Sequence, residues 1–281
     1  EAGVVSTADK VRFVNMLSQT GVAEIEVSSF VSPKWVPQLG DASEVFAAIQ
    51  RSAGVAYSAL VPNEKGLEGA IKARIDKAAV FTAASETFSR KNTNASIAET
   101  IERFKPVVKG AKAAGMHVRG YVSCVVACPY EGPVKPQQVR IVAEQLLSIG
   151  VDEIDLGDTI GVAGPADIDK LYEGLNGLLS PDQTTLHLHD TRGTALACAF
   201  RAMQLGVRSF DSSAGGLGGC PYAPGAAGNL ATEDLVYLCQ RCGVKCGADL
   251  NRVVEASRFM ASVLRRMPVS RVFQAITNSC R

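Results

Sequence analysis

The sequence predicts an α/β protein of the (β/α)8 TIM-barrel class, with an extra helix near the C-terminal end. Short runs rich in β-branched residues alternate with segments of helical periodicity, the pattern of a parallel sheet whose crossovers are helices. This many strand-helix units favour closure into a barrel over an open sheet. A length of 281 residues suits one such domain, and no repeat or linker divides it. We therefore expect residues 1–281 to form a single catalytic domain.

Seven strands are expected, and the chain opens in a loop that leads to a helix. We therefore expect the first barrel strand to lie upstream of Glu1. The expected strands are 23–27, 56–60, 77–82, 117–123, 153–156, 184–189 and 208–212. The expected helices are 7–19, 42–50, 65–73, 97–114, 136–149, 165–179, 195–205 and 233–242, followed by a final helix at 250–266.

End signals support several of these helices. Ser96 and Glu99 have the spacing of a capping box, in which each side chain caps the backbone of the other. Gly115 and Gly150 follow two long helices, where a left-handed residue is common.

Composition excludes several classes of function. Hydrophobic residues are 47% of the chain and the formal net charge is +1, so no basic field would attract nucleic acid or an anionic membrane. No apolar run approaches the roughly 20 residues that span a bilayer, and the polar residues 1–10 do not resemble a signal peptide. We expect neither a nucleic-acid nor a membrane partner.

The eight cysteines are scattered through a long chain, which favours free thiols in a reducing compartment over a disulfide framework. Cys239, Cys242 and Cys246 have a spacing that suggests zinc. They lie around the end of an expected helix without a fourth ligand nearby, so a structural zinc site is not expected.

Two of the three histidines, His187 and His189, lie two apart on an expected strand. Alternate residues of a strand face the same side, so both imidazoles would point into the barrel while Leu188 faces the helices. Neighbouring neutral imidazoles invite a divalent cation. The alternative is that both are hydrogen-bonded core residues. The pairing of two histidines favours the metal.

The glycine-rich segment 215–228 follows the last expected strand, where barrel active sites lie. Its glycines would allow it to close over a ligand, although a plain connecting loop is the alternative. Cys220 near its centre could exchange a proton, and Asn229 offers an amide oxygen to a hard metal.

Two carboxylates also deserve a functional reading. Glu26 lies within an apolar strand, as either an active-site acid or the partner of a buried salt bridge. Asp158 follows an expected strand, where a carboxylate could serve as a general acid or base, with a buried salt-bridge partner as the alternative.

Taken together, these segments resemble the 3-hydroxy-3-methylglutaryl-CoA (HMG-CoA) lyase family, in the metal-dependent barrel superfamily that also holds isopropylmalate and homocitrate synthases. A His-x-His pair marks only the superfamily, whereas the glycine-rich loop with its cysteine is more specific to the lyases. The resemblance covers nearly the whole chain and is carried by Ser29-Phe-Val-Ser-Pro-Lys-Trp-Val-Pro-Gln38, Arg119-Gly-Tyr-Val-Ser-Cys124, Cys128-Pro-Tyr-Glu-Gly132, Leu156-Gly-Asp-Thr-Ile-Gly161, His187-Leu-His-Asp-Thr191 and Gly216-Leu-Gly-Gly-Cys-Pro-Tyr222.

The resemblance implies roles for individual residues. His187, His189 and Asn229 would bind a divalent metal, Mg²⁺ or Mn²⁺, and Cys220 would be the catalytic thiol. Three acidic positions of the family's active site are matched by Glu26, Asp158 and Glu233. The family's remaining ligand, an aspartate preceded by a catalytic arginine, would precede Glu1. This chain departs from its relatives at Asp155, where they often carry serine, and at Arg192, where they often carry tyrosine.

The implied reaction is cleavage of the acyl-CoA substrate HMG-CoA to acetyl-CoA and acetoacetate, a step of leucine breakdown and ketone-body formation. The resemblance also implies a homodimer, located in the cytoplasm of a bacterium or the mitochondrial matrix of a eukaryote. Two alternatives remain at this stage. One is a condensing synthase or aldolase on the same barrel, and the other is a non-catalytic protein that uses its thiols for partner contacts.

Overall fold

The computed structural model describes residues 4–218 and 228–278. Seven strands of this part of the chain form one sheet in the order β1-β2-β3-β4-β7-β8-β9. Their bounds are Glu24–Ser29, Ala56–Leu60, Lys77–Ala83, His117–Ser123, Glu153–Asp158, Thr184–Leu188 and Ser209–Asp211. The spatial order follows the chain order, as in a (β/α) barrel and unlike a doubly wound sheet, in which the order reverses. The predicted fold class is confirmed.

The chain divides into two compact units. The first comprises residues 1–78, 213–217 and 231–281, and the second comprises residues 79–212 and 218–230. No described helix is long and apolar enough to cross a membrane.

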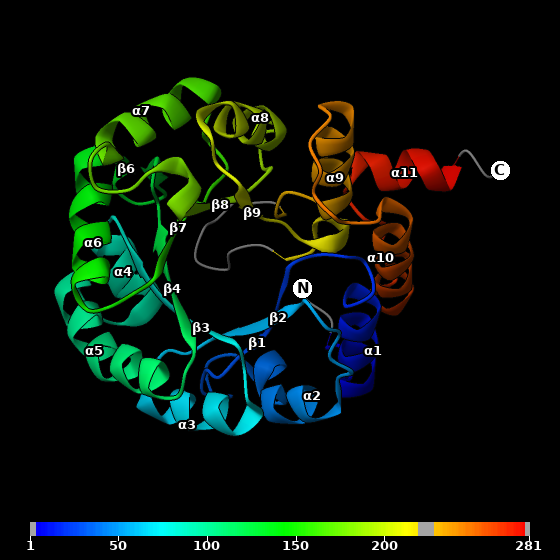
Figure 1. Ribbon diagram of the computed structural model, residues 1–281, viewed down its shortest axis with the longest axis horizontal. Coiled ribbons are helices and arrows are strands. Elements are labelled where there is room, and N and C mark those ends of the chain that lie inside the picture. Colours follow the sequence, from blue (N-terminus) through cyan, green and yellow to red (C-terminus); the bar gives the residue numbers. More distant parts are fainter. Residues whose placement is uncertain (1–3, 219–227, 279–281) are drawn as a thin grey trace. The chain divides into compact units, whose positions relative to one another are not determined.

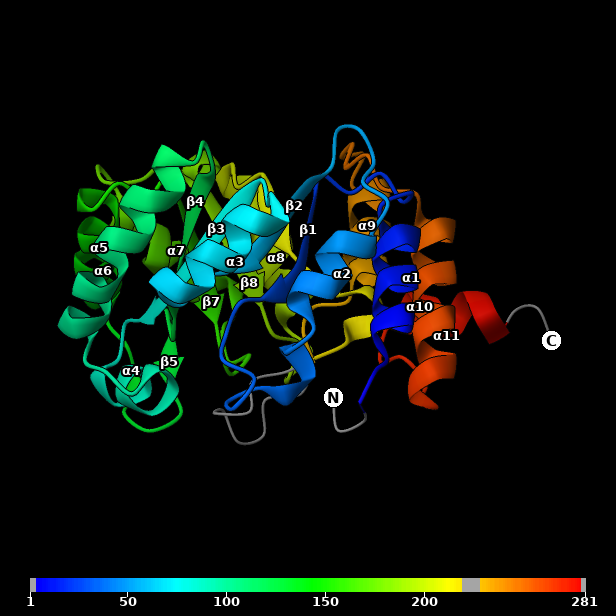
Figure 2. The ribbon, with the colours of Figure 1, turned by 90° about the horizontal axis from the view of Figure 1, so that it is seen from below.

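The first unit contains strands β1 and β2, which pair in parallel with Glu26 opposite Ser58. Helices α1 and α10 lie side by side (Figures 1 and 2), and the guanidinium of Arg12 lies 4.4 Å from the centre of the Phe259 ring. A Cβ at Gly21 would lie 2.4 Å from the Gly247 carbonyl oxygen, so only glycine fits this close approach. The helices of this unit are α1 (Thr7–Leu17), α2 (Ala42–Ala48), α3 (Glu64–Ala73), α9 (Thr232–Arg241), α10 (Leu250–Leu264) and α11 (Arg271–Asn278).

The second unit contains the parallel strands β4, β7, β8 and β9, with helices α5 to α8 along one side of them (Figure 1). A Cβ added at Gly120 of β4 would lie 3.1 Å from the Leu146 side chain of α6, which places the even-numbered residues of β4 under the helices. The helices are α4 (Glu86–Thr93), α5 (Ile97–Ala113), α6 (Pro136–Ser148), α7 (Pro165–Leu175) and α8 (Ala195–Leu205). A two-stranded antiparallel hairpin joins β5 (Ala127–Cys128) to β6 (Gly132–Pro133).

The helix-covered face of these strands forms the core of the second unit. Its side chains are fully or almost fully buried: Val118, Val122, Ile154, Leu156, Leu186 and Leu188. Burying such side chains stabilises a fold by roughly 1.5–3 kcal/mol each.

The predicted boundaries hold best where end signals exist. Ser96 and Glu99 form the expected capping box, and Gly115 and Gly150 have positive φ. The helix expected at 165–179 ends earlier, at Leu175, because Asn176 has a non-helical ψ of 134° and Gly177 has a φ of 76°. Sequence periodicity missed α4, α11 and the β5–β6 hairpin. Helix α4 is short and polar with Phe88 as its one aromatic anchor, and its start depends on the Ser85 side chain, which accepts a hydrogen bond from the Phe88 N–H.

Candidate metal centre

The two neighbouring histidines are positioned by strand β8 of the second unit. His187 pairs with Gly157 of β7 on one side and with Asp211 of β9 on the other. His189 follows the strand and forms an isolated bridge with Asn229. The two imidazole ring centres are 5.4 Å apart, as the two-residue alternation predicts. The structure thus brings His187, His189 and Asn229 together.

Both ring nitrogens of His187 have a polar neighbour. Nδ1 lies 3.1 Å from Oδ2 of Asp211, and Nε2 lies 3.1 Å from Oδ1 of Asn229. A neutral imidazole carries only one N–H, so it can donate to only one of these two oxygens. If Nδ1–H donates to Asp211, then the lone pairs of Nε2 and of the Asn229 oxygen face each other, which is an arrangement that a cation between them would stabilise.

His189 is buried, and among the described residues its Nδ1 has no hydrogen-bond partner. Burial, together with the neighbouring His187, lowers the pKa of His189 to about 4. The imidazole is therefore neutral at pH 7, which is the form that binds metals.

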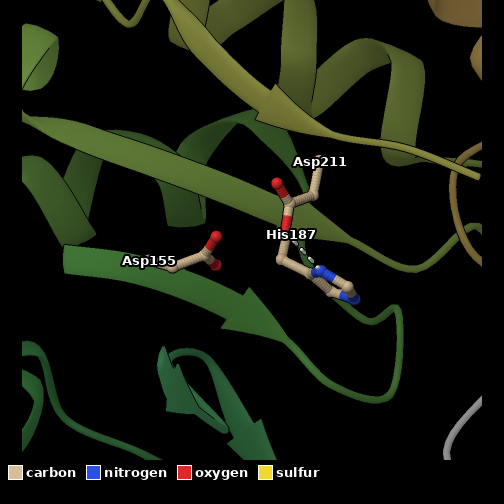
Figure 3. A group of neighbouring side chains, drawn as sticks. All are labelled: Asp155, His187 and Asp211. Atoms are coloured by element: carbon tan, nitrogen blue, oxygen red, sulfur yellow. Dashed lines mark hydrogen bonds and ion pairs between the residues drawn. The ribbon is translucent and has the colours of Figure 1, made fainter. Parts of the chain in front are cut away.

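A network of buried charges lies beside His187, on the same face of β4, β7 and β9. The Arg119 side chain donates to Oδ1 of Asp211 at 3.1 Å, and its other terminal nitrogen lies 2.8 Å from a Glu153 carboxylate oxygen. Asp155 lies 3.7 Å from the same guanidinium and is completely buried. Figure 3 shows Asp155, His187 and Asp211, contributed by three successive strands of the sheet.

These contacts move the pKa values of the two aspartates in opposite directions. For Asp155, burial and the adjacent negative charge of Asp211 raise the pKa well above its ordinary value. For Asp211, burial opposes ionisation, but the hydrogen bond from His187 and the charge of Arg119 hold the pKa well below its ordinary value. Asp211 is thus the ionised member of the pair.

Asp155, His187 and Asp211 also form a group that could itself hold a metal, since one ligand atom of each lies within 4.8 Å of the others. No other group of three histidine, cysteine, aspartate or glutamate side chains in residues 4–218 and 228–278 meets this distance. From the sequence, Asp155 was noted only as a departure from relatives, and neither Asp211 nor Arg119 was given a role. The available signal was the repetition of polar residues at alternate positions of otherwise buried strands.

Asp158, the predicted acid or base, ends strand β7 on the face opposite to His187. It pairs in register with Leu188, a residue of the helix-covered face. Its carboxylate accepts hydrogen bonds from the N–H groups of Val162 and Ala163, at 3.2 and 2.9 Å. Burial raises the pKa of Asp158, although these loop amides partly offset it. The structure therefore does not bring Asp158 onto the face that carries the histidines.

The two remaining predicted acids lie in the first unit, in different surroundings. Glu26 is exposed on β1, so it is not the buried salt-bridge partner that one interpretation expected. Glu233 is fully buried in the first turn of α9, where both carboxylate oxygens lie 3.0 Å from the N–H of Gly215. Burial raises the pKa of Glu233. Cys220, the predicted catalytic thiol, lies outside the described residues.

Comparison with known proteins identifies strong similarity over almost the whole chain. Residues 2–260 match the family described as HMGL-like. The chain is 47% identical over 275 residues to the mitochondrial hydroxymethylglutaryl-CoA lyase of Macaca fascicularis, covering 98% of this chain and 85% of that protein.

Solved structures of HMG-CoA lyases are likewise similar to this protein over almost the whole chain. The HMG-CoA lyase of Bacillus subtilis superposes with a TM-score of 0.96 at 45% identity, covering 99% of this chain and 93% of that one. An HMG-CoA lyase of Acinetobacter baumannii, solved in complex with coenzyme A and 3-methylmalate, superposes with a TM-score of 0.94 at 36% identity. That match covers 98% of this chain and 90% of the other.

Proposed function

This chain belongs to the HMGL-like family, and on that premise we propose that it is a carbon–carbon lyase that cleaves HMG-CoA to acetyl-CoA and acetoacetate. The observation that carries the proposal is the joint presence of whole-chain similarity to HMG-CoA lyases and of a cluster of metal-ligand side chains on one face of the second unit. We also propose that residues 1–281 act as one catalytic domain.

The donor set fits a divalent cation. Two imidazoles and an amide oxygen converge, the Nδ1 atom of His189 has no hydrogen-bond partner in the described chain, and Nε2 of His187 lies 3.1 Å from the Asn229 oxygen. That separation is close to the roughly 3 Å between adjacent ligands of an octahedral ion with bonds of about 2.1 Å. The residues that would hold the ion are His187, His189 and Asn229, and Mg²⁺ or Mn²⁺ suits this mixed set.

A divalent ion at this position would lower the pKa of the substrate's tertiary hydroxyl and orient the bond to be broken. Loss of the hydroxyl proton to a base lets the oxygen's electron pair form the ketone of acetoacetate. The electrons of the broken carbon–carbon bond then pass to the acetyl-CoA fragment as an enolate, and a proton donor converts that carbon into the methyl group of acetyl-CoA.

The base and the proton donor have named candidates. The sequence predicts Asp158 as a general acid or base, but its carboxylate is held by two loop amides on the other face of β7. A histidine beside the metal is the alternative base, and a neutral imidazole can accept the proton only while its one lone pair is not bound to the ion. We propose Cys220 as the proton donor, since an unperturbed thiol pKa of ~8.5 suits donation near neutral pH. Cys220→Ser should then lower kcat by far more than it changes KM.

Glu233 of the first unit would hold the backbone of the glycine-rich segment rather than react. Glu233 holds the backbone N–H of Gly215, at the start of the glycine-rich segment that contains Cys220. We propose that this anchor sets where the segment begins. Glu26 remains a candidate active-site acid on the basis of the family resemblance alone.

The test is to incubate the metal-depleted full-length protein with HMG-CoA, with and without added Mg²⁺ or Mn²⁺. We expect equal amounts of acetyl-CoA and acetoacetate, formed only with metal. Absence of both products would contradict the proposal. A parallel incubation with acetyl-CoA and a 2-oxo acid would release free CoA if the chain were instead a condensing synthase.

Curated relatives include mitochondrial and bacterial forms, which supports a proposal about the location of this protein. We propose a cytoplasmic enzyme if the source is bacterial and a mitochondrial matrix enzyme if it is eukaryotic. We also propose a homodimer, which sedimentation of the purified protein would test.

A further inference from the structure

The contact between Asp211 and His187 determines which ring nitrogen of that histidine carries its proton. Asp211 Oδ2 lies 3.1 Å from Nδ1, whereas Nε2 faces the Asn229 oxygen. An ionised carboxylate is a stronger acceptor than an amide oxygen, so the single proton of a neutral imidazole belongs on Nδ1. The lone pair is then left on Nε2.

Arg119 holds Asp211 in place for this contact. Its guanidinium donates to Asp211 Oδ1 at 3.1 Å, so the two oxygens of this carboxylate are divided between arginine and histidine. Arg119 is only 5% exposed, and its guanidinium is also held by Glu153 at 2.8 Å. The hydroxyl group of Tyr121 adds a donor to Asp211 at 3.3 Å. Asp211 therefore has little freedom to turn away from His187.

The same arginine argues against a cation on the Nδ1 side of His187. A cation held by Asp155, His187 and Asp211 would share two carboxylates with a guanidinium that lies 3.1 and 3.7 Å from them. Two positive charges at such short range repel each other by an amount that burial increases. On the other side of the ring, His187 Nε2 lies 3.1 Å from the neutral amide oxygen of Asn229.

We propose that Asp211, fixed by Arg119, is a positioning residue that holds His187 in the Nδ1–H tautomer, so that Nε2 is the nitrogen offered to the metal. This inference rests on the proposed metal site of the lyase and assigns a residue that supports it. A carboxylate that accepts the remote N–H of a metal-binding histidine typically raises metal affinity 10- to 100-fold.

The first measurement requires no metal and no substrate. The chain has three histidines, so ¹⁵N-histidine labelling gives three ring spin systems that long-range ¹H–¹⁵N spectra can assign to a tautomer. We expect His187 as the Nδ1–H tautomer in the wild-type protein. Asp211→Ala should shift it toward Nε2–H, and Asp211→Asn, which offers only an amide oxygen like that of Asn229, should give a mixture of the two tautomers. An Nε2–H tautomer in the wild-type protein would overturn the proposal.

The second measurement is Mn²⁺ affinity by calorimetry. We expect a 10- to 100-fold loss in Asp211→Ala and a smaller loss in Asp211→Asn. Asp152→Asn is the matched control, because Asp152 accepts a hydrogen bond from the backbone N–H of Val118 in the same unit and does not contact His187. Its Mn²⁺ affinity should equal that of the wild type.

Asp155→Ser separates the two possible metal positions. If Mn²⁺ binds on the Nε2 side, this variant should keep its stoichiometry and stay within about threefold of wild-type affinity. Loss of the ion in Asp155→Ser would place it between the two aspartates and would contradict the proposal. The tautomer and affinity results are independent of turnover. A protein that follows them but does not cleave HMG-CoA would therefore disprove the proposed function and leave this inference standing.

Discussion

The two faces of strands β4, β7 and β8 are built from alternate residues of the same segments, yet they differ completely in chemistry. Under the helices lie Leu186 and Leu188, both almost fully buried. Between them in sequence, His187 points the other way with its side chain 32% exposed, beside Asp211 and Arg119. Burial of one face stabilises the fold by transfer free energy and packing, and the other face carries the side chains proposed to bind the metal.

The difference shows where this protein departs from the most stable arrangement. A buried arginine with three carboxylate neighbours costs desolvation energy that its ion pairs only partly offset. Apolar residues of the same volume would often be as stable or more so. The polar face is therefore better explained by function than by stability, and substitutions on the two faces should affect different measurements.

The largest effect is expected for His187→Ala. Removing one of the proposed ligands should lower Mn²⁺ affinity at least 100-fold while the free energy of unfolding changes little, because the side chain is partly exposed. Calorimetry and urea unfolding measure the two quantities. The matched control is His117→Ala at the start of β4, which removes an exposed histidine and should retain the metal.

Leu186→Ala tests the opposite face. Deleting a fully buried leucine should lower the free energy of unfolding by about 2–5 kcal/mol, measured by urea denaturation. The fraction that remains folded should bind Mn²⁺ normally. A strong loss of affinity without loss of stability would show that the two faces are not separate in function.

Asp158 is a charged residue on the apolar face, and its effect should depend on pH. Its folded-state pKa is raised, so the stability it contributes is complete below the unfolded pKa of about 3.9 and is lost as pH rises through the folded value. Asp158→Asn does not titrate. The stability of this variant relative to the wild type should therefore increase from pH 4 upward and then level off. A pH-independent difference between the two unfolding curves would contradict the raised pKa.

The smallest effect is expected outside both faces. Phe200 on α8 is 43% exposed, so Phe200→Ser should change the free energy of unfolding by no more than about 0.5 kcal/mol. Metal affinity should be unchanged. A change of more than about 2 kcal/mol would mean that this surface packs against something in solution.

Local patterns in the sequence were enough for the fold class and for the orientation of His187 and His189. Strand alternation fixes which side a residue faces, and the capping box at Ser96 fixes where a helix begins. The family resemblance predicted that Asn229, which follows His187 by 42 residues in the chain, lies beside the histidines.

Other parts of the site depend on contacts that no local pattern records. Arg119 and Asp211 are 92 residues apart, and only the register of β4, β7, β8 and β9 brings them together. The position of Asp158 near a strand end suggested acid–base chemistry. Asp158 comes one residue after Gly157, which pairs with His187, so its side chain lies on the opposite face of β7 and accepts hydrogen bonds from loop amides.

The most direct test of the account is the position of the metal itself. Crystals of the full-length protein soaked in Mn²⁺ should give an anomalous-difference peak within coordination distance of His187 Nε2, His189 and the Asn229 oxygen. A peak between Asp155 and Asp211, or none at these residues in a crystal of protein that cleaves HMG-CoA with Mn²⁺, would contradict it.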